Sequence, residues 1–117
     1  MAIRELAEKF TALLKQGKDK EASETYWSDD VVSLEAMEGE MSHLQGKDAV
    51  FKKHDWWYDN FTVHSADVEG PYIHGDQFAL QFFMDTTNKQ TGERSQMKEV
   101  GLYTVKDGKI TQERFFY

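Results

Sequence analysis

Glu35 is the residue that the sequence places best for transferring protons. It lies in the segment Val31–Met37, which alternates as a β-strand does and puts Glu35 on the same face as Ser33, between apolar neighbours. We expect the aromatic side chains of Phe10 and Trp27 to complete this setting. Because an apolar setting disfavours a charged carboxylate, it prepares such a group for proton transfer at neutral pH. We therefore predict that Glu35 is the principal acid–base residue.

His54 is the second candidate, because it shares one helical stripe with Val50 and Trp57. An imidazole can gain and lose a proton near neutral pH, so His54 could relay a proton or hold Glu35 by a hydrogen bond. The alternative is a surface histidine that packs beside Trp57. We predict His54 as a catalytic residue that faces Glu35.

The sequence favours chemistry without a metal or a cofactor. It has no cysteine, and its four histidines, at positions 43, 54, 64 and 74, include no pair at the close spacing of metal ligands. His74-Gly75-Asp76 resembles a fragment of an iron site, but a turn at the glycine explains it more simply. The sequence contains no phosphate-binding loop and no dinucleotide fingerprint. We predict no metal and no cofactor.

The charge of the chain limits its partners. The formal net charge is −7, and the acidic residues are spread along the chain. Nucleic acids and anionic membranes need a basic surface, so we predict that the protein binds neither. No run approaches the roughly 18 apolar residues of a membrane span, and the start lacks the apolar core of a signal peptide. We expect a cytoplasmic protein.

The spacing of apolar residues predicts three helices followed mainly by strands. The apolar residues from Ile3 to Leu14 repeat at helical spacing, and Gly17 ends this helix. Asp107-Gly108 between two apolar runs predicts a hairpin with a type I′ turn. The other expected elements are helices at Lys18–Trp27 and from Gly46 to about Tyr58, strands at Val31–Met37, Phe61–Glu69 and Gln77–Thr87, a loop or short hairpin at Glu38–Gln45, and the two hairpin strands within Glu93–Tyr117.

These elements predict one α+β domain over residues 1–117, with helices packed on one face of a curved, mainly antiparallel sheet. Gly101 within a strand indicates a bulge or a close backbone approach, and a curved sheet under helices leaves a pocket. If Gly101 faces that pocket, so do its neighbours of equal parity. The expected pocket residues on the strands are Gln81, Phe83, Met97, Glu99, Tyr103, Glu113, Phe115 and Tyr117, and those outside these strands are Phe10, Trp27 and Trp57.

The same parity predicts an apolar outer face, more extensive than a monomer normally exposes. We therefore predict a homodimer through the outer face of the sheet. The residues expected on that face are Phe78, Leu80, Phe82, Met84, Val100, Leu102 and Phe116.

The aromatic run Trp56-Trp57-Tyr58 adds an alternative for the ligand. We interpret these residues as core and pocket rim. A cage for a cation is the other interpretation, and the acidic chain would suit one.

The order of the elements resembles the NTF2-like superfamily, especially its SnoaL-like and ketosteroid-isomerase-like members. The resemblance covers nearly the whole chain and depends on Tyr26–Val32, on the helix start Gly46–Val50 and on Val105–Ile110 before a terminal aromatic strand. It implies a cone-shaped fold, a deep pocket and frequent dimers. It does not imply one chemistry, because the superfamily includes enzymes of several kinds and non-catalytic binders.

Residue by residue, the resemblance supports some site assignments and weakens others. It puts Glu35 where ketosteroid isomerases keep their carboxylate base, and His54 where a pocket tyrosine lies. Phe10 stands in place of the oxyanion-hole tyrosine and Gly101 in place of the second acid, so ketosteroid isomerase activity itself is not expected. Glu99, two residues before Gly101, is a displaced acid and our third catalytic candidate.

Two functions follow from these features. The first is a cofactor-independent acid–base enzyme, an isomerase, cyclase, dehydratase or hydrolase that acts on a small, largely apolar molecule. The second is a non-catalytic small-molecule-binding domain with the same pocket. An enzyme needs titratable groups within reach of one ligand position, whereas a binder needs only an apolar lining with its polar groups satisfied.

Overall fold

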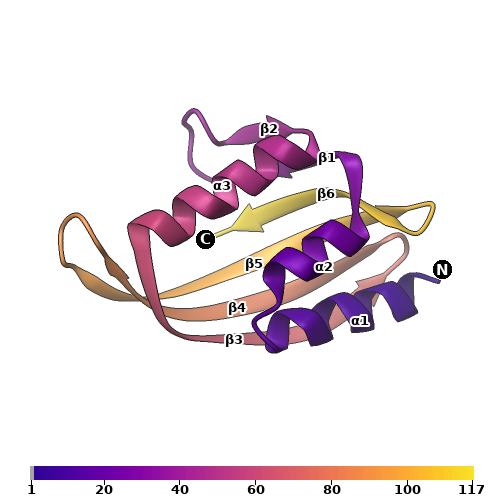
Figure 1. The fold of residues 1–117 in the computed structure, drawn as a ribbon. Coiled ribbons are helices and arrows are strands. Elements are labelled where there is room, and N and C mark those ends of the chain that lie inside the picture. Colours follow the sequence, from indigo (N-terminus) through magenta and orange to yellow (C-terminus); the bar gives the residue numbers. More distant parts are fainter. Residues whose placement is uncertain (1) are drawn as a thin grey trace.

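The computed structural model describes residues 2–117 and places three helices on one face of a six-stranded sheet (Figure 1). In chain order the elements are α1 (Ile3–Lys15), α2 (Asp19–Tyr26), β1 (Trp27–Leu34), β2 (His43–Gln45), α3 (Lys47–Asn60), β3 (Phe61–His74), β4 (Gln77–Asn88), β5 (Arg94–Lys106) and β6 (Lys109–Phe116). The predicted α+β fold, with its helices in the first half of the chain, is confirmed.

The sheet is antiparallel except at one junction. Its strand order is β2-β1-β6-β5-β4-β3, and only β1 and β6 pair in parallel. α1 packs against β3 and β4, while α3 packs against β1 and β3, so the helices lie across the same curved face (Figure 1). No helix within residues 2–117 lies on the outer face of the sheet.

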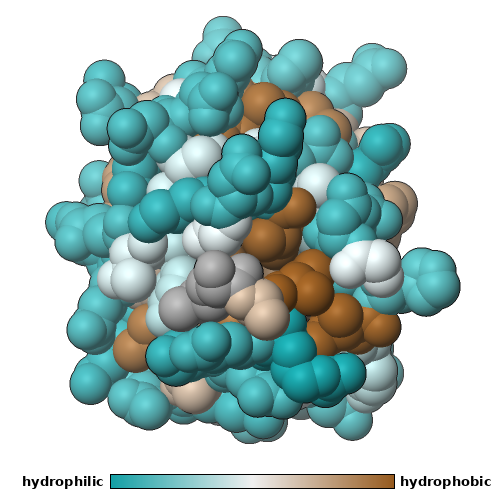
Figure 2. Space-filling view, turned by 90° about the vertical axis from the view of Figure 1, so that its right-hand side faces the viewer, coloured by the Kyte–Doolittle hydropathy of each residue, from teal (hydrophilic) through white to brown (hydrophobic). Residues whose placement is uncertain are grey.

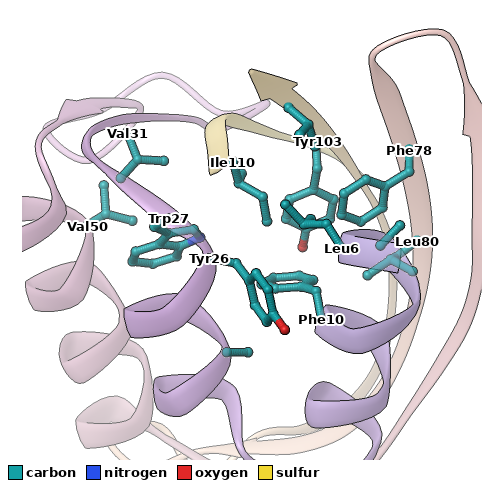
Figure 3. Close-up of a cluster of buried hydrophobic side chains, with 13 residues drawn as sticks. Leu6, Phe10, Tyr26, Trp27, Val31, Val50, Phe78, Leu80, Tyr103 and Ile110 are labelled. Atoms are coloured by element: carbon teal, nitrogen blue, oxygen red, sulfur yellow. The ribbon is translucent and has the colours of Figure 1, made fainter. Parts of the chain in front are cut away.

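The core lies where α1 meets the middle strands. Leu6, Ala7 and Phe10 follow one another at helical spacing on α1 and are almost completely buried. The ring of Phe10 lies 6.1 Å from that of Phe78 and 5.2 Å from that of Tyr103, measured between centroids. Figure 3 shows these side chains converging between the helices and the sheet. The amphipathic stripe predicted from residues 3–14 therefore covers the sheet as expected.

The C-terminal hairpin has the predicted turn. Asp107 and Gly108 both have positive φ, 52° and 75°, as a type I′ turn requires. The turn leaves β5 and β6 paired from Lys106 and Lys109 to Val100 and Phe116. The segment Glu38–Gln45, expected to be a loop or a short hairpin, is a loop that leads into β2, and β2 pairs antiparallel with β1.

Two predicted boundaries around β1 are wrong. Trp27 does not end the second helix but begins β1, with an extended backbone at φ −73° and ψ 141°. Its indole is buried against Phe51 and His54 of α3, and this packing outweighs the helical spacing of the preceding residues. β1 ends at Leu34, so Glu35 lies just beyond it, although the Glu35 backbone N–H still donates to the carbonyl of Ser42.

The predicted end of the third strand at Gly70-Pro71 is also wrong, because β3 continues to His74. The pairing of β3 with β4 is irregular between Glu69 and Tyr72. This irregularity accommodates a proline, which has no N–H to give to the ladder, without ending the strand.

The faces of β4 are opposite to the prediction. Phe82 pairs with Glu99 and Met84 with Met97, and directly paired residues project from the same face of a sheet. Phe78, Leu80, Phe82 and Met84 therefore face the helices, and Phe78 and Leu80 are 1% and 0% exposed. Gln81 and Phe83 face outward. Both faces of β4 are rich in apolar residues, so alternation alone could not show which face is covered.

The surface is mostly hydrophilic at the end of the molecule that lies on the right in Figure 1. Figure 2 shows this end, with a strip of apolar side chains crossing a largely polar surface. Among residues 2–117, no helix combines the length and the apolar character that crossing a bilayer would require. The cytoplasmic location stays a prediction.

Dimerisation through the outer face of the sheet also stays a prediction, with a revised set of residues. Val100, Leu102 and Phe116 keep their outward positions, and the register of β4 adds Phe83. Phe116 is 46% exposed. We propose that these side chains meet in a homodimer, because none of the three described helices covers them.

We predict that Phe116→Glu converts this dimer to a monomer, because it would bury an unpaired carboxylate in the interface. Sedimentation velocity at micromolar protein concentration measures the change. Gln16→Glu, which adds the same charge at the end of α1, should leave the dimer intact. A wild-type monomer, or a Phe116→Glu dimer as stable as the wild type, would contradict this interface.

Candidate functional site

A cavity of about 630 Å³ lies between the helices and the inner face of the sheet. Its wall includes Trp57 and Phe61 near the end of α3, and Met84 and Met97, which project from paired positions on β4 and β5. These elements place it toward the left in Figure 1, away from the end shown in Figure 2. Its volume is typical of a small-molecule site, and most of its wall is aromatic or aliphatic.

A buried network of polar side chains forms one part of the cavity wall. Ser33 and Glu113 occupy paired positions on the parallel strands β1 and β6, and the Ser33 hydroxyl donates to Glu113 Oε1 at 3.0 Å. Lys53 of α3 donates through Nζ to Ser33 Oγ and to Glu35 Oε1, the latter at 2.8 Å. Ser33 is 0% exposed and Glu113 2% exposed. Lys53 thus connects two strands to the helix that covers them.

His54 lies beside Glu113 rather than beside Glu35. Its Nε2 is 3.9 Å from Glu113 Oε1, and its ring packs edge-on against Trp27 at 5.1 Å between centroids. The expected hydrogen bond between His54 and Glu35 is absent among the described residues, because Lys53 holds the Glu35 carboxylate instead. The four residues Val50, Lys53, His54 and Trp57 form the inner stripe of α3, so neighbouring positions on it reach different carboxylates.

Glu99 has the titration behaviour that the sequence analysis expected of Glu35. The pKa of Glu99 is raised from 4.5 to about 7, chiefly by burial in the cavity wall and, to a smaller extent, by the charges of Glu35 and Glu113. The charges of Lys53 and His54 act in the opposite direction. Glu99 is therefore a carboxyl group that changes its protonation near neutral pH.

Two tyrosines complete the polar part of the wall. Burial raises the pKa of Tyr103 well above its ordinary value, and the charges of Glu113 and Glu99 add to the effect. Burial also raises the pKa of Tyr117, whose hydroxyl oxygen accepts a hydrogen bond from the Met37 N–H at 3.4 Å. Both phenols stay protonated at neutral pH and can donate hydrogen bonds.

Most residues predicted for the site line this cavity. The strands and β6 terminus contribute Met97, Glu99, Tyr103, Glu113, Phe115 and Tyr117, and the rest of the chain contributes Phe10, Trp27, Glu35, His54 and Trp57. The predicted positions of Gln81 and Phe83 are wrong, because both project from the outer face of β4. Phe82 and Met84 take their places in the wall.

Lys53 is the main residue that the sequence analysis missed. Its position was available, because it lies three residues after Val50 on the stripe that also carries His54. A lysine on a helix is ordinarily solvated, and nothing in the spacing shows that Ser33 on β1 and Glu35 just beyond β1 lie opposite this lysine. In the structure Lys53 is 9% exposed.

The aromatic run in α3 lies at the rim. The Trp57 ring stacks on Phe61 at 4.2 Å, and the Tyr58 hydroxyl donates to Asp19 Oδ2 at 2.7 Å, which ties α3 to α2. Trp56 is 46% exposed. Among residues 2–117, no group of three or more histidine, aspartate and glutamate side chains comes together in a way that could hold a metal ion.

Comparison with known proteins identifies the family. A family model described as a SnoaL-like domain matches residues 1–117. A proposed SnoaL-like polyketide cyclase from Mesorhizobium loti, whose description also carries the words carbohydrate phosphatase, is 58% identical, with a TM-score of 0.98 and full coverage of both chains. No curated protein matches the chain.

More distant structures share the fold alone. A proposed isomerase from Bacillus subtilis is 20% identical, with a TM-score of 0.73 over 95% of this chain and 82% of that one. A Catenulispora acidiphila protein with a ketosteroid isomerase-like fold, solved with trimethylamine, is 16% identical, with a TM-score of 0.75 over 97% of this chain and 85% of that one. The chain therefore belongs to the SnoaL-like domain family and has the NTF2-like fold.

Proposed function

We propose that the protein is a cofactor-independent acid–base enzyme that acts on a small, largely apolar molecule held in the cavity. The observation that carries this proposal is the combination of a mostly apolar cavity of about 630 Å³ with several carboxyl groups, among them those of Glu35, Glu99 and Glu113, and with a lysine and a histidine on its wall. Apolar walls bind the body of a ligand, and titratable groups beside them can move its protons. The likeness to a proposed polyketide cyclase and a proposed isomerase supports this class of reaction.

Within this proposal Glu99 is the proton-transfer residue. Glu35 already accepts a hydrogen bond from Lys53, and Glu113 accepts one from Ser33. Glu99 forms no side-chain hydrogen bond with the described residues, and its pKa of about 7 lets it take up and release a proton at neutral pH. Glu35 and His54 are then supporting residues, which set the charge around Glu99 and contact the ligand.

The reaction step is a proton transfer from a carbon atom of the ligand to the Glu99 carboxylate. The C–H bond breaks, its electron pair stays on the ligand, and the proton becomes the carboxyl proton of Glu99. Return of that proton to another atom of the ligand restores the enzyme. Isomerisation, cyclisation and dehydration can each begin with such a step.

A non-catalytic binding domain is the second candidate. The pairing of Glu35 with Lys53 and of Glu113 with Ser33 favours it, because a binder needs its buried polar groups satisfied and needs no reactive base. The two candidates differ in one observable property, which is whether the bound ligand exchanges its protons faster than the free ligand.

We predict that Glu99→Gln lowers the rate of carbon-bound proton exchange by about 10²- to 10⁴-fold, the usual contribution of a positioned acid–base group. The assay follows hydrogen–deuterium exchange by NMR in D₂O, with a panel of small ketones, esters and nitroalkanes. The wild-type rate should rise with pH through about 7, because the deprotonated carboxylate is the base.

The control for this assay is Glu93→Gln, which makes the same change on the exposed turn before β5. It should behave as the wild type does. A Glu99→Gln protein that keeps the wild-type rate and pH profile would remove Glu99 from this role. Exchange no faster than in buffer across the whole panel would leave the binding domain as the function.

The raised pKa of Glu99 also predicts a pH-dependent stability. The unfolded chain loses this proton near pH 4.5 and the folded protein near pH 7, so the wild-type free energy of unfolding should fall, relative to Glu99→Gln, as the pH rises through this window. The difference should reach up to about 3 kcal/mol. Urea unfolding between about pH 4 and pH 8 measures it, and a constant difference would show that Glu99 is not buried as described.

We predict that Lys53→Met moves the Glu99 titration to higher pH, because the lysine charge lowers the Glu99 pKa and methionine of similar length does not. NMR of carbon-13-labelled glutamate carboxyl groups measures the midpoint. Lys52→Met, an exposed neighbour on α3, is the matched control and should leave the midpoint unchanged. A midpoint that moves downward in Lys53→Met would contradict the described arrangement of charges.

A further inference from the structure

Tyr103 places a hydrogen-bond donor on the cavity wall without using it. The side chain comes from β5 and is 3% exposed, and it lines the cavity. Its hydroxyl makes no hydrogen bond with any other described residue, and the hydroxyl oxygen is not fully enclosed by protein. A buried donor of this kind is unfavourable unless something supplies an acceptor. The cavity is where that acceptor can come from.

The position of this hydroxyl is fixed by aromatic packing. The Tyr103 ring stacks on Phe78 at 4.9 Å and 15°, and Phe10 and Phe115 approach it edge-on at 5.2 Å and 6.5 Å. Figure 3 shows Tyr103 held beside Phe10 and Phe78. A ring packed on several sides cannot turn away from the cavity, so the packing of the core fixes the direction in which the Tyr103 hydroxyl points.

Gly101 makes room for the ring. A β-carbon at this position would lie 3.0 Å from both Cε2 and the hydroxyl oxygen of Tyr103, and 3.1 Å from Cε2 of Phe82. These distances are tighter than ordinary contacts of a β-carbon, so a side chain at position 101 would require the Tyr103 and Phe82 rings to shift by a few tenths of an ångström. The tyrosine therefore leans back along its own strand over Gly101, toward Glu99, which projects into the cavity from the same face.

The charges around the hydroxyl decide which acceptor suits it. Burial, with a smaller contribution from the charges of Glu113 and Glu99, raises the pKa of Tyr103 and keeps the phenol protonated, so it serves as a donor. An anionic ligand group would be repelled by the same carboxylates. An uncharged acceptor meets no such penalty, and a carbonyl oxygen accepts a hydrogen bond without bringing a further donor that would need a partner.

We propose that the Tyr103 hydroxyl donates a hydrogen bond to a carbonyl oxygen of the ligand, so that the cavity selects small, largely apolar carbonyl compounds. This proposal rests on the proposed function in that it concerns the same cavity. It adds a substrate class and a specificity-determining atom. Tyr103 recognises the oxygen, and the aromatic wall holds the rest of the molecule.

The test compares two ligands that differ at one group, 2-acetylnaphthalene and 2-ethylnaphthalene. The first has a carbonyl group where the second has a methylene group. Quenching of the tryptophans on the cavity wall, Trp27, Trp56 and Trp57, reports binding. Wild-type protein should bind the ketone about three- to ten-fold more tightly than the hydrocarbon, as one neutral hydrogen bond would give. Tyr103→Phe should abolish this preference and leave hydrocarbon binding unchanged.

Tyr26→Phe is the matched control. Tyr26 is a buried tyrosine of the same aromatic cluster, with its ring 6.3 Å from Phe10, but it does not line the cavity. Its variant should keep the full preference for the ketone. Gly101→Ala should weaken the preference, because the added methyl group would push the Tyr103 hydroxyl and ring edge by a few tenths of an ångström from their position.

Infrared difference spectroscopy of the wild-type complex gives a readout that needs no variant. The carbonyl stretch of bound 2-acetylnaphthalene should lie at lower frequency than in hexane, as a hydrogen-bonded carbonyl does. Equal affinity for the two ligands, an unshifted stretch, or a preference that survives in Tyr103→Phe would overturn the proposal while leaving the acid–base function standing. If neither ligand binds, the small-molecule cavity fails and both proposals fail with it.

Discussion

The burial of Glu113 is the constraint on which the site depends. A carboxylate that is 2% exposed is strongly unfavourable unless hydrogen bonds and opposite charges surround it. Ser33 supplies the hydrogen bond from the adjacent parallel strand, and Lys53 donates to Ser33 from the helix above. His54 lies 3.9 Å away on the same helix. These partners come from β1 and α3, so the carboxylate on β6 fixes how the helix sits over the sheet.

This arrangement also explains why Glu99 differs from Glu35 and Glu113 in having no hydrogen-bond partner for its carboxyl group among the described residues and a raised pKa. Lys53 is held by Ser33 and Glu35, and the hydroxyl of Ser33 is used by Glu113. No further donor of this network reaches Glu99, which faces the negative charges of the other two carboxylates in an apolar wall. A network that satisfies two acids thus creates the conditions that raise the pKa of the third. Lys53 therefore links the hydrogen-bonded acids, Glu35 and Glu113, to the titration of Glu99.

The sequence predicted the elements of the fold better than the contacts of the site. Helical spacing and the Asp107-Gly108 turn are local signals, and both correspond to the structure. The inward positions of Glu99 and Glu113 followed from parity within one hairpin. The face of β4 did not, because its residues are apolar on both sides and only the pairing of Phe82 with Glu99 decides between them. The partner of Glu35 depends on the meeting of α3 with β1, which no local pattern encodes.

Phe10 and Gly101 show how two departures from a family pattern form one arrangement. The resemblance to ketosteroid isomerases would place a tyrosine and an acid at these positions. Here the Phe10 ring packs 5.2 Å from Tyr103, and Gly101 leaves the space that the Tyr103 ring fills. A tyrosine at position 10 would bring a further hydroxyl into this packed cluster, beside those of Tyr26 and Tyr103, and an acid at position 101 would press against the Tyr103 ring. Phe10 and Gly101 therefore make it possible for Tyr103 to present a hydroxyl to the cavity, in place of the tyrosine and the acid that the family pattern has at positions 10 and 101.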